Sequence, residues 1–158
     1  MVRLANSLRT RVGADNNESS EELPLPAATE ETILAAVIER YAQNRRLIRA
    51  CAREYNVRPV FVWQPVPTYK YDLRYHLWPQ STHSLVARPG FGYPLMARTV
   101  KTHEKEYVED FLWLADMQEQ MTEPLYVDAC HYTARFSKEI AIRIGSFLLE
   151  RQLLVEAE

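Results

Sequence analysis

The chain of 158 residues has only two cysteines, no long apolar run and no excess of charge of one sign. Cys51 falls in an expected helix and Cys130 beside a candidate catalytic histidine, so we expect two free thiols rather than a disulfide framework. No window approaches the roughly 18 apolar residues that a membrane span needs. The formal charge of -2 gives no electrostatic reason to expect nucleic acid or an anionic membrane as a partner. The composition predicts an ordinary soluble globular domain.

The first 28 residues carry no apolar period. Residues 1–12 contain three arginines but no apolar core of a signal peptide, and residues 13–28 are rich in Asn, Ser, Glu and Pro. We therefore expect 1–28 to be a mobile segment and linker, and 29–158 to form one α/β unit. The cellular compartment stays unknown.

The remaining chain alternates helical and strand patterns. Apolar residues recur at helical spacing after Thr29, a good N-cap, up to Asn56, which can end a helix in the left-handed conformation. Residues 60–63 and 111–114 are apolar on both faces, like buried parallel strands. Further helices are expected over about 94–109 and after Thr133. This order is typical of an α/β layered domain.

Prolines and glycines divide residues 64–92, which predicts a long aromatic-rich loop. Its aromatic rings offer faces for a sugar or an acyl chain, and His83 would shape the rim of the same pocket. The same pattern fits equally well a loop whose rings only pack against one another. The candidate substrate-binding residues are Tyr69, Tyr71, Tyr75, Trp78 and His83. Arg45 and Arg46 are expected on a solvated helix face.

Asp128 and His131 are the candidate catalytic residues, in the run Tyr-Val-Asp-Ala-Cys-His-Tyr-Thr over 126–133. A nucleophilic hydrolase needs a base that takes the hydroxyl proton and an acid that orients this base. A separation of three residues in a turn before a helix lets the carboxylate reach the imidazole. By spacing alone, a helix cap beside a surface histidine is the commoner explanation, because an Asp and a His three residues apart often occur by chance. Both expected strands, however, would end here, where open α/β sheets bind ligands.

This run resembles the last motif of the SGNH (GDSL-type) hydrolases, an Asp-x-x-His just before the C-terminal helix. The resemblance extends over about 41–149 and includes Pro-Val-Phe-Val-Trp-Gln-Pro-Val-Pro over 59–67 and Phe-Leu-Trp-Leu-Ala-Asp over 111–116. It implies a three-layer α/β/α fold with a parallel sheet, as in flavodoxin-like domains. The implied reaction is hydrolysis of a small-molecule or carbohydrate ester through an acyl-enzyme. His131 would act as general base and then acid, Asp128 would orient it, and no cofactor would be needed.

The family's Gly-Asp-Ser-like nucleophile motif and its oxyanion Gly and Asn motifs are absent. Gly-Ala-Asp-Asn-Asn over 13–17 places its asparagine one residue late, and no apolar strand precedes it. The chain is therefore predicted to be the C-terminal part of such a domain, inactive alone and prone to self-associate through an unpaired sheet edge. The alternative is a non-catalytic α/β binding module whose loop over 64–92 recognises a carbohydrate or a protein.

No metal site is expected from the spacing of the histidines. His76 and His83 lie near Asp72 and Asp116 in the sequence, but no pair has the short spacing of a known metal motif. Cys130 directly precedes His131, and adjacent side chains in a turn are expected to point apart.

Overall fold

The computed structural model describes residues 29–78 and 87–154. His83 and the motif-like segment 13–17 lie outside these residues, as does the predicted N-terminal linker. The elements follow one another as α1 (Glu30–Glu54), β1 (Phe61–Trp63), the 3-10 helix η1 (Leu73–Tyr75), α2 (Ala87–Thr102), α3 (Glu104–Tyr107), β2 (Phe111–Trp113) and α4 (Ala134–Glu150).

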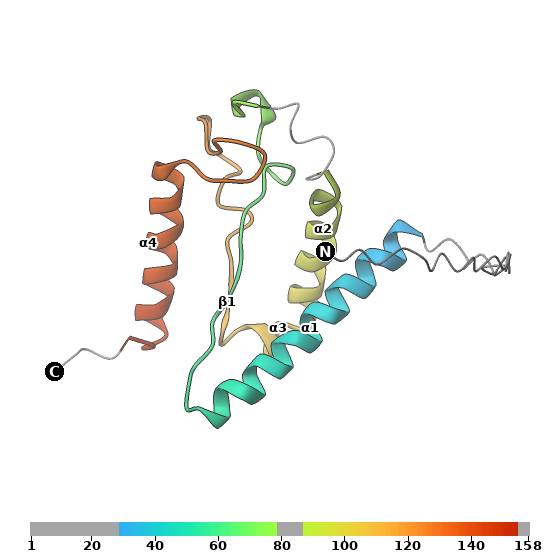
Figure 1. Cartoon of the computed structure of the whole chain (residues 1–158), viewed down its shortest axis with the longest axis vertical. Coiled ribbons are helices and arrows are strands. Elements are labelled where there is room, and N and C mark those ends of the chain that lie inside the picture. The colour runs from blue at the N-terminus through green and yellow to red at the C-terminus, as the bar shows by residue number, and fades with distance from the viewer. Residues whose placement is uncertain (1–28, 79–86, 155–158) are drawn as a thin grey trace, which may run out of the picture.

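The two strands form a small parallel sheet. Phe61 lies opposite Phe111 and Trp63 opposite Trp113. In Figure 1 the strands run between α4 on one side and α1 with α2 on the other. The predicted α/β class with parallel strands is confirmed at this level. Because the strands are parallel, the segments that follow β1 and β2 meet at the same edge of the sheet.

Local capping signals set the helix ends that the sequence predicts. The Thr29 Oγ1 accepts a hydrogen bond from the Thr32 amide at 3.3 Å, and Thr133 Oγ1 accepts one from the Phe136 amide at the same distance. After α1, Asn56 adopts a left-handed φ of 53° and turns the chain toward β1. Each cap satisfies an amide that the first helical turn leaves without a partner.

The α2 helix differs from the prediction. The predicted loop over 64–92 ends earlier, because α2 begins at Ala87 and contains Pro94, where the sequence places a helix start. Packing explains the difference. A Cβ on Gly92 would lie 3.5 Å from Cδ2 of Leu34 in α1, an ordinary van der Waals distance, so the two helices pack against each other at this point. Met96 is fully buried one turn later. Tertiary contact therefore overrides the local preference of proline.

Two clusters of buried side chains make the core. The helix–sheet core contains Ile38, Met96, Tyr107 and Phe111, which join α1, α2 and α3 to the strands. The loop core contains Tyr71, Leu125, Tyr126 and Phe136, which join the loops after both strands to α4. The loop core thus fixes the first turn of α4 at the edge of the sheet where the strands end.

The α1 helix also presents apolar side chains to solvent. Ile33, Val37, Leu47 and Ile48 are 53%, 58%, 64% and 48% exposed. The helix–sheet core therefore covers only one side of α1.

No helix in the described part of the chain is long and apolar enough to cross a membrane.

Candidate active site

A short hairpin-like turn positions Asp128 and His131. Tyr126 and Tyr132 form an antiparallel bridge, and the Val127 amide donates to the His131 carbonyl at 2.9 Å. The Thr133 amide donates to the Leu125 carbonyl at 2.8 Å. Since Thr133 is also the N-cap of α4, the turn leads directly into that helix. Asp128 and His131 thus lie at the edge of the sheet where β1 and β2 end.

The two candidate side chains contact each other directly. The Asp128 Oδ2 lies 2.7 Å and its Oδ1 2.9 Å from the His131 Nδ1. Asp128 Oδ1 also accepts the backbone amides of Cys130 at 3.0 Å and His131 at 2.8 Å. Among the residues that the structure describes, none hydrogen-bonds to the Nε2 of His131. The contact expected from the three-residue spacing is present.

These hydrogen bonds stabilise the charged form of Asp128. The backbone amides of Cys130 and His131, followed by the His131 imidazole, lower the pKa of Asp128 to about 2. Asp128 is thus an anion at neutral pH, which favours the histidine tautomer with its proton on Nδ1. That tautomer leaves the Nε2 lone pair free, as a general base requires.

The pair is open to water. The Asp128 side chain is 52% exposed and that of His131 is 74% exposed. Triad chemistry depends on preorganised dipoles in a site that excludes water. The described residues therefore hold the Asp128–His131 pair in place without enclosing it.

Cys130 lies closer to His131 than the sequence suggests. Its Sγ is 3.8 Å from the His131 Nδ1, although adjacent side chains in a turn are expected to point apart. The cause is Asp128, which draws two successive amides onto one carboxylate oxygen and so tightens the turn. One ligating atom from each of Asp128, Cys130 and His131 lies within 4.8 Å of the other two.

Gln118 supports the turn, and the sequence does not reveal it. Its side chain is fully buried, and its Nε2 donates to the carbonyls of Val66 at 2.8 Å and Tyr69 at 2.5 Å. Its Oε1 accepts a hydrogen bond from the Tyr126 hydroxyl at 2.6 Å. Gln118 thereby joins the loop after β1 to the residue where the turn begins. A polar residue between Met and Glu carries no local signal for such a role.

The predicted substrate-binding residues are distributed over different environments. Tyr71 is buried, and its hydroxyl donates to the Glu123 carbonyl and accepts from the Leu125 amide. Tyr75 packs against the same loop core. Tyr69 is half-buried against Tyr93, with ring centroids 5.0 Å apart. Of the four aromatic residues predicted for this role, Trp78 is the exposed one, at 59%.

His76 packs into the loop core as well. It is 4% exposed, its ring stacks on Tyr126 at 5.7 Å, and its Nδ1 accepts the Trp78 amide at 2.9 Å. Burial lowers the pKa of His76, while the nearby backbone of Asp128 opposes the shift. A neutral His76 therefore acts as a packing residue under the turn.

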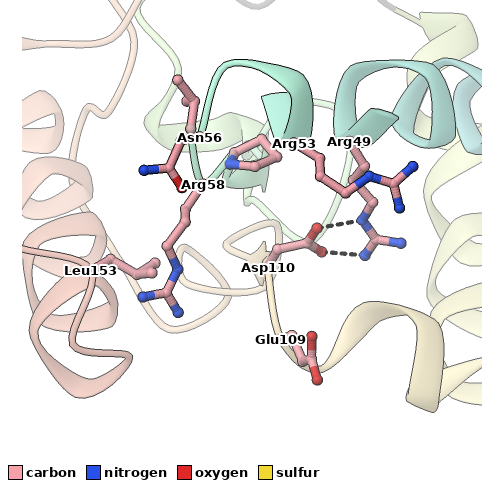
Figure 2. A pocket seen from close by; sticks show the side chains of 9 residues that line it. Arg49, Arg53, Asn56, Arg58, Glu109, Asp110 and Leu153 are labelled. Atoms are coloured by element: carbon pink, nitrogen blue, oxygen red, sulfur yellow. Dashed lines mark hydrogen bonds and ion pairs between the residues drawn. The ribbon is translucent and has the colours of Figure 1, made fainter. Parts of the chain in front are cut away.

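A second polar site lies where α1 ends and the strands begin (Figure 2). It is a cavity of about 380 Å³ whose charged lining consists of Arg49, Arg53, Arg58, Glu109 and Asp110. The C-terminal end of α1 carries partial negative charge, which stabilises arginines here without any ligand. This cavity is at the opposite end of the strands from Asp128 and His131.

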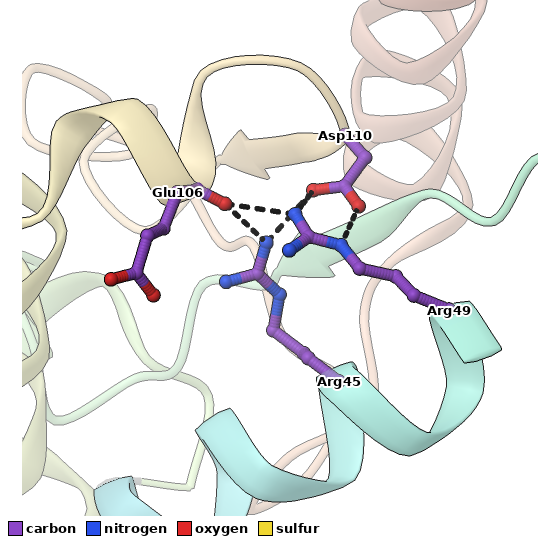
Figure 3. Close-up of polar contacts among 4 residues, drawn as sticks. All are labelled: Arg45, Arg49, Glu106 and Asp110. Carbon is purple, nitrogen blue, oxygen red and sulfur yellow. Dashed lines mark hydrogen bonds and ion pairs between the residues drawn. The ribbon is translucent and has the colours of Figure 1, made fainter.

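Beside this cavity, Arg45 is buried rather than solvated, which corrects the sequence-based expectation (Figure 3). Its Nη2 donates to Asp110 Oδ1 at 2.8 Å and to the Glu106 carbonyl at 3.2 Å. Arg49 binds both oxygens of Asp110, at 2.5 and 2.6 Å. The guanidinium of Arg45 also lies 4.0 Å from the centre of the Tyr107 ring. Arg46, by contrast, is exposed as expected.

Comparisons with models of protein families, with curated proteins and with solved structures give no match to this chain. The assignment of a function therefore depends on the chemistry of the Asp128–His131 turn and on the resemblance of its sequence motif.

Proposed function

We propose that the chain is the C-terminal part of an SGNH-type serine ester hydrolase and supplies the acid and base of its triad. The observation that carries this proposal is the Asp128 carboxylate on the Nδ1 of His131, with no described residue hydrogen-bonded to the imidazole Nε2. The position of this pair, in the turn between β2 and α4, fits the same proposal. Helices on both sides of a parallel strand pair are consistent with part of a three-layer fold.

In this role the Nε2 of His131 takes the proton of a serine hydroxyl as that oxygen attacks the ester carbonyl. The protonated imidazole then gives this proton to the leaving alcohol. In the second half of the reaction, His131 activates water that releases the acid from the serine. Asp128 orients the ring and stabilises its charged form throughout. The serine and the oxyanion donors belong to residues beyond those of the Asp128–His131 turn.

The deciding experiment uses the longest reading frame that contains these residues. Its product is treated with a fluorophosphonate, which labels activated serines. We expect one labelled serine, in a Gly-Asp-Ser-like motif that follows a strand, and loss of labelling in H131A. D128N should slow ester hydrolysis by a factor on the order of 10⁴, as expected when the histidine loses its orienting carboxylate.

H103Q is the matched control, because His103 is an exposed histidine in the α2–α3 junction, with its Nδ1 3.1 Å from the Thr99 carbonyl oxygen. It should label like the unaltered protein. Labelling that survives H131A would contradict the proposal. If no reading frame supplies a nucleophile motif, the remaining candidate is a binding module, for which the exposed indole of Trp78 is the first contact to test.

A second measurement tests the local chemistry in the chain itself. Long-range ¹H–¹⁵N spectra should show neutral His131 with its proton on Nδ1, because Asp128 accepts a hydrogen bond there. In D128A the Nε2-protonated tautomer should gain population. An unchanged tautomer ratio would show that Asp128 does not orient the ring.

A further inference from the structure

We propose that Asp128, Cys130 and His131 also form a binding site for one zinc-class divalent cation. Three different ligand types converge here, a carboxylate oxygen, a thiol sulfur and an imidazole nitrogen, within 4.8 Å of one another. All three residues are exposed, so an ion can reach them from solvent. The site is built from residues 128–131 alone.

Two of the three distances between the ligand atoms are close to those of a tetrahedral site, and the third, between Cys130 and Asp128, is at most 4.8 Å. With Zn–S near 2.3 Å and Zn–N near 2.0 Å, the sulfur and nitrogen ligands of one ion lie about 3.5 Å apart. The Cys130 Sγ and His131 Nδ1 are 3.8 Å apart, so they need to move by only a few tenths of an ångström. The Asp128 Oδ2 is 2.7 Å from Nδ1 and must withdraw to about 3.3 Å to share the ion. Both oxygens of Asp128 are held near the ring, so either can become the ligand.

The donor set selects the class of metal. Thiolate and imidazole favour zinc and similar transition metals over magnesium and calcium, which prefer sites made of oxygen alone. Three protein ligands leave a fourth position for water, as in zinc sites that exchange ligands. The backbone hydrogen bonds from Cys130 and His131 to Asp128 hold the ligands together before the ion arrives. This preorganisation reduces the entropy cost of binding.

One consequence rests on the proposed function. An ion on Nδ1 displaces the proton through which Asp128 orients His131, so metal binding and general-base action exclude each other. Zinc would then inhibit the complete hydrolase, and a chelator would restore it. The binding itself does not depend on this consequence.

The test is a titration of the full chain with Zn²⁺ in competition with a chromogenic chelator, under a phosphine reductant. We expect one equivalent to bind. C130S and H131A should each weaken binding by at least about tenfold, since even groups outside the coordination shell typically contribute that much. Co²⁺ should give a thiolate-to-metal absorption band that C130S removes.

The chain offers matched controls. Cys51 is an exposed free cysteine in α1, and His103 is an exposed histidine, so C51S and H103Q should bind zinc like the unaltered chain. Circular dichroism checks that the variants stay folded. We expect them to do so, because all the substituted side chains are exposed. The proposal is overturned if less than one equivalent binds, or if C51S weakens binding as much as C130S. No ester enters this titration, so its outcome is independent of the fluorophosphonate experiment.

Discussion

Replacing Asp110 with alanine should strongly destabilise the fold, because this carboxylate neutralises a buried arginine. The Arg45 side chain is 4% exposed and that of Asp110 is 16% exposed. Removing one partner of a buried ion pair leaves the other charge without compensation, which costs about 3–5 kcal/mol. Arg45 retains the Glu106 carbonyl and the face of Tyr107. We therefore expect a loss near the lower limit, about 3 kcal/mol.

The partners of Asp110 provide internal controls. The Arg49 side chain is 36% exposed, and without it Asp110 still binds Arg45, so R49A should cost only about 1 kcal/mol. R45M should change stability by less than about 1.5 kcal/mol, since an apolar residue of similar length replaces a buried charge and Asp110 keeps Arg49. R45M/D110A should recover part of what D110A loses, because the buried charge is then gone.

Urea unfolding, followed by the fluorescence of Trp63 and Trp113 in the strands, measures these differences. With a slope of about 1.5–2 kcal/mol/M, the D110A midpoint should fall by about 1.5–2 M. A loss no larger than that of R49A would show that Arg45 is solvated in the native state. A double variant less stable than D110A would show that the stem of Arg45, rather than its charge, stabilises the core.

Four further results are expected. The chain alone should hydrolyse p-nitrophenyl acetate no faster than an equal concentration of free imidazole, because its sequence has no nucleophile motif of the Gly-Asp-Ser type; a rate well above the imidazole level that H131A abolishes would contradict this. The carboxyl carbon of Asp128 should titrate near pH 2 by NMR. Because the pKa of Asp128 is lower in the folded than in the unfolded chain, the stability that its carboxylate contributes is present above about pH 4 and disappears as the pH falls toward 2. T133A should cost about 1 kcal/mol in urea unfolding, since the Phe136 amide loses its cap, and an unchanged midpoint would refute the capping role. The chain should bind a hydrophobic dye and elute above monomer size, and V37K should reduce both effects; a monomer that binds no dye would mean that the chain closes its own core.

Local signals in the sequence suffice for the elements whose ends are capped. Thr29, Asn56 and Thr133 each set a helix end through their own side chain or backbone preference, and the structure places them as predicted. Local signals fail at α2, where Pro94 predicts a start and the structure has a helix interior. Contact between α1 and α2 decides this helix, and no pattern within the segment reports that contact.

The same distinction applies to the polar residues. Asp128 and His131 lie three positions apart, so a local turn can bring their side chains into contact, and the position of this turn before the last helix supports the prediction. Arg45 and Asp110 are 65 positions apart, and nothing near Arg45 indicates a carboxylate. The spacing of Arg45 and Arg49, one turn apart on α1, was the available hint that both side chains share one face. Gln118 offers no such hint, because all its partners are distant carbonyls and a hydroxyl.

Long-range contacts nevertheless decide whether the local pair can act. The Tyr132 hydroxyl donates to the Pro65 carbonyl at 2.7 Å, and Tyr126 is held through Gln118 to the loop after β1. The turn between these tyrosines is therefore anchored at both ends to the edge of the sheet. The geometry of this turn depends only on residues of this chain, so the Asp128–His131 contact forms without a nucleophile. The proposed triad chemistry also needs a His131 that is shielded from water, whereas the described residues leave its side chain 74% exposed. A variant that loosens the anchor, such as Q118A, should for this reason weaken the Asp128–His131 contact without touching either residue.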